Sequence, residues 1–512
     1  MSSTARSQRL ARMRAEEDFL ALTEARLESQ RRADVAARER LAAAQAEADA
    51  TRAEVQALEE RQRQLRHGID ELRAQHRREL WTHAIPLDCL RYIFEETTVI
   101  SNDEWAHFET WEHSGARTSM PFTLASVCRR WRQLAVATPA VWTYISQDAS
   151  PYGKSLSPRM LARISLLLLR SSCDRLDIRL KLDMCSSSGL SNMSTLLSLI
   201  AVHAPRIGSM HLHLPKTAMR EPHMDMFKAP LPSITHLCIV VSSGNAWELN
   251  AHGGYLPYAP KLEYLKLEST GITCSTPYQN FGSLRELVLF PPCTQAQVVP
   301  FLIAASPTLE RLYLGSTKLI TATTPNPITF PRLSSLASGG ASFSTALCDM
   351  MRMPALQSLS MPGWTVVESF TRLFEHTAKN ISSLTLVGDC TQESTLGVLQ
   401  MLHNVQTLCF SDNSQYLFYD VSNDFFEELA TASPPIWPKL RSIRLDASVS
   451  SKSKFGDGLV SLIRARNFTE VNAVPNAAPE ARPCKLETVD LQSPSTPLWL
   501  RSAVDHMLSS RS

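Results

Sequence analysis

The sequence predicts an α/β protein in three successive parts: a long N-terminal helix, a small all-α module, and a solenoid of short strands that alternate with helices. Residues 1–84 contain no proline and a single glycine, Gly68, which favours one continuous helix. Residues 85–146 place apolar side chains at helical spacing around prolines and tryptophans. From about residue 161 to 500, one short apolar motif recurs at a nearly constant step, which indicates a repeat array.

The composition narrows the classes of partner and the compartment. The 512 residues carry a net charge of only +2, so no overall field favours nucleic acid or an anionic membrane. The eleven cysteines include no C-x-x-C pair, which indicates reduced thiols instead of a disulfide framework or a zinc site. The sequence contains no apolar signal core and no run of eighteen apolar residues. We expect no membrane partner, no nucleic-acid partner, and a cytoplasmic or nuclear location, or both.

Residues 1–84 have the composition of an exposed helix, with sixteen arginines against fifteen acids. A heptad count that starts at Leu20 finds an alanine-rich and partly polar seam in the first half. From Val55 to Leu72 the a and d positions are mostly apolar, which is typical of a coiled coil. The pattern therefore predicts either a coiled coil, within one chain or between two copies in a homodimer, or a solvated single helix.

Residues 85–146 are expected to form an all-α module of short helices. In the stretch IPLDCLRYIF, Pro86 precedes a helix whose apolar face holds Leu87, Leu90, Ile93 and Phe94. A polar stretch at about 100–121 predicts a loop. A second helix follows, with Leu124, Val127 and Trp131 at helical spacing. It should end before Pro139, and a Ser/Pro/Gly-rich linker is expected over 147–160.

The repeat motif is apolar-x-x-apolar-x-apolar, as in Leu262, Leu265 and Leu267. Its middle residue recurs from Met210 to Leu408 at steps of 27, 28, 22, 25, 24, 23, 25 and 24. Three further copies, centred on Ile178, Ile443 and Val489, lie at longer steps and bring the total to twelve. This spacing is typical of leucine-rich repeats, in which each copy adds one parallel strand and a helix or turn to a horseshoe. We expect this solenoid over 161–500, followed by a C-terminal tail over 501–512.

The polar residues of the strands are expected to project away from the core, because side chains alternate along a strand. Examples are Glu263, Tyr264, Lys266, Glu310, Arg311, Tyr313, Gln357 and Arg444. Those on the concave face are the natural contact surface. His211 and His213 fall on this same face, where ordinary surface histidines are favoured over a metal site.

The sequence contains no motif for catalysis. H-E-x-x-H, G-x-S-x-G and G-x-G-x-x-G are all absent, and the histidines are dispersed. No motif in the sequence therefore identifies a catalytic, cofactor-binding or metal-ligating residue, and the sequence implies no cofactor. We expect a non-enzymatic protein that acts by binding other proteins.

Two stretches resemble an F-box, especially the kind found in mushroom-type fungi, where a helical N-terminus precedes it and leucine-rich repeats follow. The family pattern has a Leu-Pro pair, an apolar pair, a Val-Cys-Arg-x-Trp core and a Pro-x-x-Trp. The matching positions are Ile85-Pro86, Ile93-Phe94, Val127 to Trp131, and Pro139 to Trp142. Isoleucine replaces the usual first leucine, and the loop between the two stretches is long.

The resemblance implies a substrate-recognition adaptor of a cullin-RING ubiquitin ligase. An F-box docks a Skp-type adaptor, which links to a cullin, and the repeats hold an unknown substrate protein. By resemblance, the residues expected to contact the adaptor, or to support that contact, are Pro86, Leu87, Leu90, Ile93, Phe94, Leu124, Val127 and Trp131. Alternatively, the chain is a repeat-based scaffold whose F-box-like helices recruit no ligase. For Trp131, Val127 and Trp142, a place mainly in the core of the small module is an equal alternative to a role in adaptor contact.

Overall fold

The computed structural model describes most of the chain. The described residues are 3–98, 115–148, 157–182, 190–215, 227, 229–242, 254–268, 272–274, 281–290, 295–315, 327–338, 348, 350–362, 368–387, 397–411, 422–445, 456–468, 483–492 and 496–509. The chain divides into two compact units, Met1–Leu90 and Arg91–Ser512.

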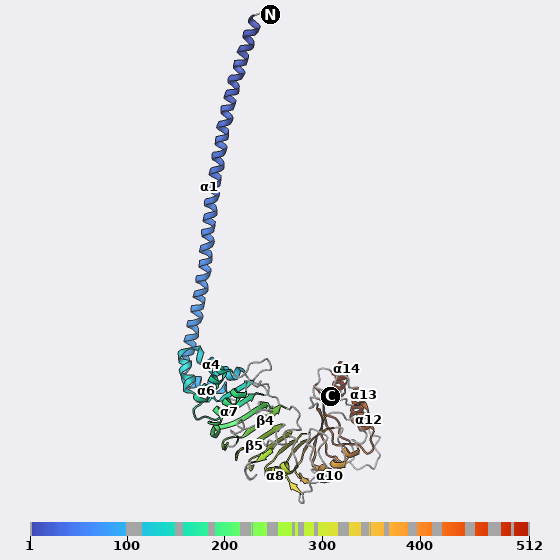
Figure 1. Ribbon diagram of the computed structural model, residues 1–512. Helices are drawn as coiled ribbons and strands as arrows, with labels where there is room; N and C mark the ends of the chain where they lie inside the picture. The colour runs from blue at the N-terminus through green and yellow to red at the C-terminus, as the bar shows by residue number, and fades with distance from the viewer. Residues whose placement is uncertain are drawn as a thin grey trace. The chain divides into compact units, whose positions relative to one another are not determined.

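The first unit is dominated by α1 (Ser3–Ala84), a single helix of 82 residues that confirms the predicted long helix (Figure 1). At 1.5 Å per residue it is about 120 Å long. Ion pairs one turn apart lie along its exposed surface, such as Arg12–Glu16 at 3.0 Å and Arg32–Glu28 at 2.7 Å. Each such pair stabilises a helix by only about 0.2–0.5 kcal/mol, so the absence of helix breakers matters as much.

The helical module contains α2 (Leu87–Glu96), α4 (Gly115–Val127), α5 (Arg129–Ala137) and the 3-10 helix η1 (Pro139–Trp142). The predicted loop at about 100–121 is wrong at its C-terminal end, because α4 already begins at Gly115. Thr118, Pro121 and Leu124 recur every three residues and are all buried, so this polar stretch does carry a helical face. Residues 101–114 lie outside the described part.

The second predicted helix is two helices, with a break at Cys128. This residue is extended, with φ −157° and ψ 172°, and its Sγ accepts a hydrogen bond from the Trp131 N–H at 3.4 Å. Arg132 Nε donates to the Ala125 carbonyl at 2.9 Å and so ties α5 back to α4. The change of direction buries Leu134 and Ala135 on α5.

The predicted linker over 147–160 is wrong at both ends. Residues 147 and 148 belong to β1 (Tyr144–Asp148), and α6 (Pro158–Arg170) starts after its N-cap, Ser157. Only 149–156 remain of the expected linker, and they lie outside the described residues. The stretch YISQD lacks the repeat motif, which explains why the sequence did not predict a strand here.

Thirteen parallel strands form one sheet in the order β1-β2-β3-β4-β6-β8-β9-β11-β13-β14-β15-β16-β17 (Figure 1). After β1, the bounds are β2 (Leu176–Lys181), β3 (Ile207–Pro215), β4 (His236–Ser242), β6 (Tyr264–Glu268), β8 (Glu286–Phe290), β9 (Arg311–Leu314), β11 (Ser335–Ser338), β13 (Ser358–Pro362), β14 (Ser383–Val387), β15 (Thr407–Ser411), β16 (Ser442–Leu445) and β17 (Thr488–Leu491). All twelve copies of the motif are strands, and β1 is the strand that the motif did not predict. The α/β class is confirmed, with an architecture consistent with leucine-rich-type repeats.

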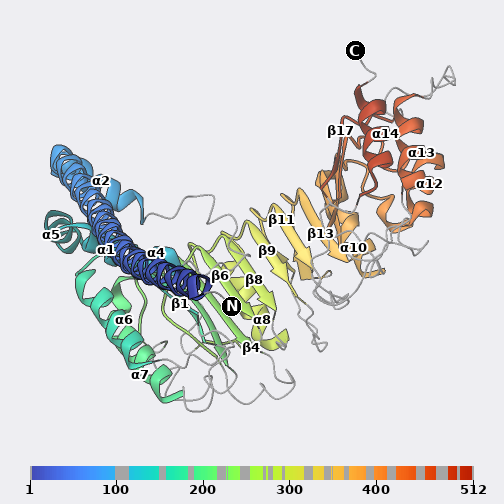
Figure 2. The same cartoon turned by 90° about the horizontal axis from the view of Figure 1, so that it is seen from above.

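Helices connect many of the strands, as expected for such repeats. They are α6, α7 (Leu190–Ala201), α8 (Gln295–Ala305), α10 (Glu368–Thr377), α12 (Asn423–Thr431) and α13 (Gly456–Asn467), and α14 (Leu498–Ser509) follows the last strand. In Figure 2, α6 and α7 lie beside the first strands, and α12, α13 and α14 lie beside the last. Short two-stranded ladders, β5 (Gly254–Leu256) with β7 (Ile272–Cys274) and β10 (Ile328–Thr329) with β12 (Met351–Arg352), occur in other connections.

The core lies between the sheet and these connections. The middle motif residues Leu237, Leu265, Leu287, Leu359 and Leu384 are fully buried. Each parallel strand alone would expose this apolar face, so neighbouring repeats stabilise one another by burying it.

The predicted C-terminal tail over 501–512 is also wrong, because α14 continues to Ser509. Leu500, Val504 and Met507 are buried at helical spacing. Three buried apolar side chains are enough to hold this last helix against the repeats.

Candidate interaction surfaces

The eight residues predicted for adaptor contact separate into two groups. Leu90, Phe94 and Leu124 are buried, whereas Leu87, Ile93 and Val127 are 48%, 44% and 50% exposed. Pro86 is exposed and Trp131 is half-buried. The helical spacing could not distinguish the two groups, because both follow the same period. Exposed apolar side chains on short helices can bind a partner, and the buried ones can only support them.

Aromatic side chains pack together in the part of the helical module that belongs to the unit Arg91–Ser512. The Phe94 and Trp131 rings meet edge to face, with centroids 5.0 Å apart. Trp142 is fully buried, and its indole N–H donates to the Ala135 carbonyl at 2.6 Å. The guanidinium of Arg170, from α6, lies 4.4 Å from the Trp142 ring centre. Trp142 is therefore a core residue that joins the helical module to the first repeat.

We call the outward face of the sheet the one whose side chains alternate with the buried apolar residues. Strand register brings its residues into rows, so that Asp177, Ser209, His236 and Tyr264 follow one another on β2, β3, β4 and β6. A second row runs through Arg179, His211, Cys238 and Lys266. Rows of this kind present an ordered grid of side chains to a partner.

The charges on the first strands of the outward face are largely paired with one another. Arg179 Nε lies 3.7 Å from Asp177 Oδ1, and Lys266 Nζ lies 3.5 Å from Glu268 Oε2. Burial raises the pKa of the Asp177 carboxyl, and the nearby Arg179 and Arg117 oppose that rise. Paired charges of this kind give a partner little net attraction, because they already neutralise each other.

Three histidines gather in this same region. His211 and His213 lie with ring centroids 5.3 Å apart, and His236 stacks on Tyr264 at 6.0 Å. Burial, together with Lys181 and Lys266, lowers the pKa of His213 to about 4, and burial with Arg175 and Arg179 does the same for His236. His211 is only 5% exposed, so the expectation of ordinary surface histidines is wrong for this residue. Its pKa is lowered well below the usual value by burial and by His213.

An apolar cluster follows on the outward face of β4 to β9. It contains the buried residues Cys238, Tyr264 and Val288, with Val240, Phe290 and Tyr313 packed against them. Burial raises the pKa of the Cys238 thiol, which makes this cysteine unreactive at neutral pH. Tyr264 was expected to project outward and does lie on this face, but it is buried by its neighbours.

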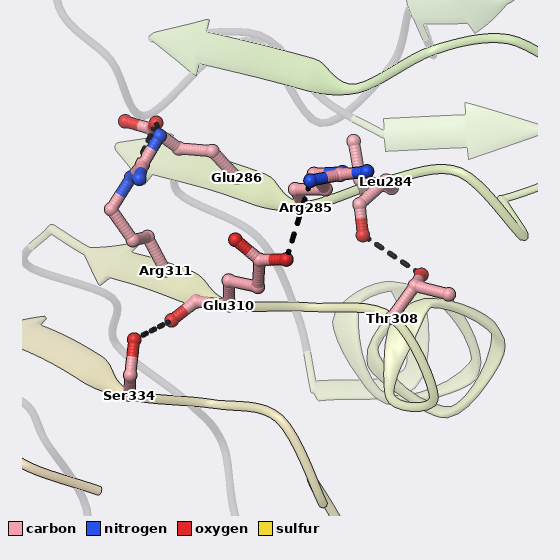
Figure 3. Close-up of polar contacts among 7 residues, drawn as sticks. All are labelled: Leu284, Arg285, Glu286, Thr308, Glu310, Arg311 and Ser334. Atoms are coloured by element: carbon pink, nitrogen blue, oxygen red, sulfur yellow. Dashed lines mark hydrogen bonds and ion pairs between the residues drawn. The ribbon is translucent and has the colours of Figure 1, made fainter.

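Ion pairs cross the edge of the sheet at β8 and β9 (Figure 3). Arg311 Nε donates to Glu286 Oε2 at 2.7 Å, and Arg285 Nη1 lies 3.6 Å from Glu310 Oε1. Hydroxyl groups extend the arrangement, since Thr308 Oγ1 donates to the Leu284 carbonyl at 2.8 Å and Ser334 Oγ to the Glu310 carbonyl at 3.2 Å. These contacts run between successive repeats and fix the spacing of the edge.

The chemistry of the outward face changes after β9. From β11 to β15 the outward positions hold only serine, threonine, alanine, cysteine, valine or proline, and none is charged. Charge returns on β16 and β17 with Arg444 and Asp490. The repeats thus offer two different surfaces to a partner, one charged and aromatic, the other flat and rich in hydroxyls.

A pocket of about 880 Å³ lies where the first strands begin. Its walls include Arg117 on α4 and Arg175 and Glu263, which directly precede β2 and β6. Both arginine side chains form hydrogen bonds to backbone carbonyls: Arg117 Nε donates to the Thr98 carbonyl at 3.0 Å, and Arg175 Nη2 donates to the Gly208 carbonyl at 2.9 Å. No sequence pattern predicts this recess, because its residues come from seven separate segments of the chain.

The described part of the chain lacks two further kinds of feature. Within it, no group of three or more histidine, cysteine, aspartate or glutamate side chains could hold a metal ion. No helix among the described residues is long and apolar enough to cross a membrane.

Two comparisons with known proteins give no match. No protein-family model matches the chain, and a search of curated proteins finds no match either.

Proposed function

We propose that this protein is a substrate-recognition adaptor of a cullin-RING ubiquitin ligase, with F-box-like helices that dock a Skp-type adaptor and repeats that bind a substrate protein. The observation that carries the proposal is a short helical module with apolar residues left exposed, followed directly by a repeat sheet with a long outward face. Ile93 and Val127 are about half exposed on α2 and α4. They occupy positions that the F-box resemblance assigns to the adaptor contact.

In this role the protein itself needs no nucleophile and no cofactor. It raises the effective concentration of a substrate lysine near the conjugating enzyme, which supplies the chemistry. A rigid connection between the adaptor-binding helices and the repeats favours a high effective concentration of the substrate lysine, because a flexible connection would lower that concentration. Here β1 follows η1 after a single residue, Thr143, and pairs with the first repeat strand.

The decisive experiment measures capture of the adaptor by the full chain. We expect Ile93→Asp and Val127→Asp together to lower adaptor affinity at least about a hundredfold, since each removes apolar burial and forces a carboxylate into the interface. Val136→Asp is the matched control, because Val136 is 44% exposed on α5 but lies outside the predicted contact set. Equal capture by the double variant and the control would refute the proposal, as would no capture by the parent chain.

A second function is favoured by a specific observation. Solenoids need a polar cap at each end to cover the last apolar face. Here Trp142 packs beneath Arg170 of α6, and β1 extends the sheet by one strand. The helical module could therefore serve mainly as an N-terminal cap of a scaffold that recruits no ligase. The capture experiment separates the two functions, since a cap alone predicts no adaptor binding.

We also propose that α1 pairs with a second copy of the chain. Leu58, Leu65 and Leu72 lie one heptad apart and are all more than half exposed on α1. Val55 and Ile69 complete this seam at the alternate heptad positions. Analytical ultracentrifugation of the full chain should give a dimer, and Leu58→Asp with Leu65→Asp should give a monomer. A monomeric parent chain would refute the pairing.

A further inference from the structure

A second groove, of about 480 Å³, lies far along the repeats from the first pocket. It runs along the edge where β13, β14, β15 and β16 begin, and its lining comes from four successive repeats. The lining includes two lysines, four side-chain amides and one serine hydroxyl, and no acidic residue. The lining of this groove is therefore positively charged, whereas the lining of the first pocket contains four acidic residues and two arginines.

The groove is built from two rows that the repeat generates. Gln357, Ser382 and Gln406 each stand two residues before the middle apolar residue of their strand. Their backbones form a continuous ladder, because Ser382 N donates to the Gln357 carbonyl at 2.9 Å and Gln406 N to the Ser382 carbonyl at 2.7 Å. This inner row is therefore rigid before any partner arrives, which lowers the entropy lost on binding.

The outer row carries the charge. It contains Lys379 and Asn380 before β14, Asn404 before β15, and Lys439 before β16. Asn380 Nδ2 donates to the Pro354 carbonyl at 2.7 Å, and Asn404 Nδ2 donates to the Lys379 carbonyl. These amides fix the loop that carries Lys379.

The lysines of the groove differ from the basic residues that surround it. Arg441, which follows Lys439 by two residues, lies 3.2 Å from Glu487 and is already neutralised. Lys379 and Lys439 are exposed and make no ion pair with any described residue. On the first strands of the outward face, by contrast, Arg179 and Lys266 each lie beside an acidic residue. The groove therefore brings two lysines without an ion pair to any described residue together on one stretch of the edge of the sheet.

The spacing of the two lysines indicates what can bind. They precede β14 and β16, which are separated by β15, and adjacent strands lie about 4.8 Å apart, so the two sites are roughly 10 Å apart. A chain in the extended polyproline II conformation has three residues per turn and rises about 3.1 Å per residue, so its side chains at positions i and i+3 lie on one face about 9 Å apart. Single lysines this far apart suit single carboxylates. A phosphate would favour converging arginines, and the groove lining contains no arginine.

We infer that this groove binds an extended acidic segment of the substrate protein, with carboxylates three residues apart on Lys379 and Lys439. The identity of the segment as substrate rests on the proposed function, but its binding does not. Gln357, Ser382 and Gln406 would hydrogen-bond the backbone of the segment between its acidic residues. A nucleic acid is disfavoured, because no aromatic side chain lines the groove for base stacking.

The test uses the full chain and a fluorescein-labelled peptide of four Glu-Gly-Ser triplets, with binding followed by fluorescence anisotropy. We expect the peptide to bind at low ionic strength and to weaken steeply as salt rises to about 150 mM. Lys379→Ala with Lys439→Ala should lower its affinity about tenfold or more, since each lysine contributes a charge-assisted contact. Lys261→Ala is the matched control, because Lys261 stands at the equivalent repeat position before β6 and lies outside the groove.

Several results would overturn the inference. They are no binding of the glutamate peptide, unchanged binding by the double variant, or equal binding of a peptide of Lys-Gly-Ser triplets. A phosphoserine version that binds more than about tenfold tighter than the glutamate peptide would replace the carboxylate assignment by a phosphate one. Adaptor capture by the double variant should equal that of the parent chain. A groove that fails this test therefore leaves the ligase proposal standing, and the reverse also holds.

Discussion

The histidines of the outward face predict a specific dependence of stability on pH. Lys181 and Lys266 act electrostatically on His213, and Arg175 and Arg179 act on His236, whose ring also stacks on Tyr264. Burial and these cations lower the pKa of both imidazoles from 6.5 to about 4. The perturbation we consider is His213→Gln together with His236→Gln, which keeps hydrogen-bonding capacity but removes the titration.

The sign follows from proton linkage. Between pH 6.5 and about 4 the unfolded chain binds a proton at each histidine that the folded chain does not bind, so the free energy of unfolding falls as the pH falls. A shift of this size corresponds to at most about 3.4 kcal/mol for each histidine. Both rings are only partly buried, so solvent screening reduces this to about 1–2 kcal/mol for each. Below about pH 4 the loss is complete.

The assay is urea unfolding of the parent chain and the double variant at several pH values between 4 and 7. We expect the parent to lose about 2–4 kcal/mol more than the variant across this window. The raised pKa of Asp177 acts in the opposite direction, since its contribution is lost as pH rises, but it is present in both proteins and cancels in the comparison. His403→Gln, outside this cluster, is the control. Parallel pH profiles for parent and double variant would refute the reasoning.

Four further perturbations test the packing. Trp131→Ala should destabilise the chain by about 3–5 kcal/mol because it leaves a void beside Phe94, whereas Trp131→Phe should cost less than about 1.5 kcal/mol, since the buried indole N–H donates to no other described atom. Urea unfolding measures both, and equal losses would contradict this account. Gly458→Ala should cost more than about 2 kcal/mol, because its Cβ would lie 2.4 Å from the Asn423 carbonyl oxygen between α12 and α13. Gly68→Ala meets no atom within 4 Å and should instead stabilise α1 by about 0.8–1 kcal/mol, measured by helix melting; a loss there would show an unsuspected constraint. Deletion of 497–512 should lower the urea midpoint markedly, since it removes the three buried side chains of α14, each worth roughly 1.5–3 kcal/mol, while deletion of 510–512 should have no effect.

The repeats could be predicted from the sequence because their signal is redundant. A strand of four or five residues is a weak pattern alone, but nine copies at a near-constant step from Met210 to Leu408 reinforce one another, and all nine are strands. Strand β1 has no such support. Only Ile145 and Tyr144 are buried apolar residues in YISQD, and its place in the sheet depends on pairing with β2, which is a tertiary property.

The candidate surfaces were less predictable than the strands. Alternation correctly placed Lys266, Tyr264 and His211 on the outward face, but it could not indicate that two of these three are buried there. Curvature and register bring side chains from neighbouring strands together, and these depend on contacts across repeats. The first pocket and the cationic groove were missed for the same reason, since each collects residues from several repeats.

The helical module can serve both functions proposed for it. A cap requires that the side facing the repeat be apolar and buried, which Trp142 and Leu134 satisfy. An adaptor site requires apolar groups on a different side, which Ile93 and Val127 satisfy because they remain exposed after the module has packed. Since the buried and exposed groups are different residues, substitutions can separate the functions. Ile93→Asp should remove adaptor capture and leave the urea midpoint nearly unchanged. Leu134→Ala should lower the free energy of unfolding by about 2–5 kcal/mol, and the urea midpoint should fall with it. A variant at Ile93 that unfolds the chain would show that this residue belongs to the cap.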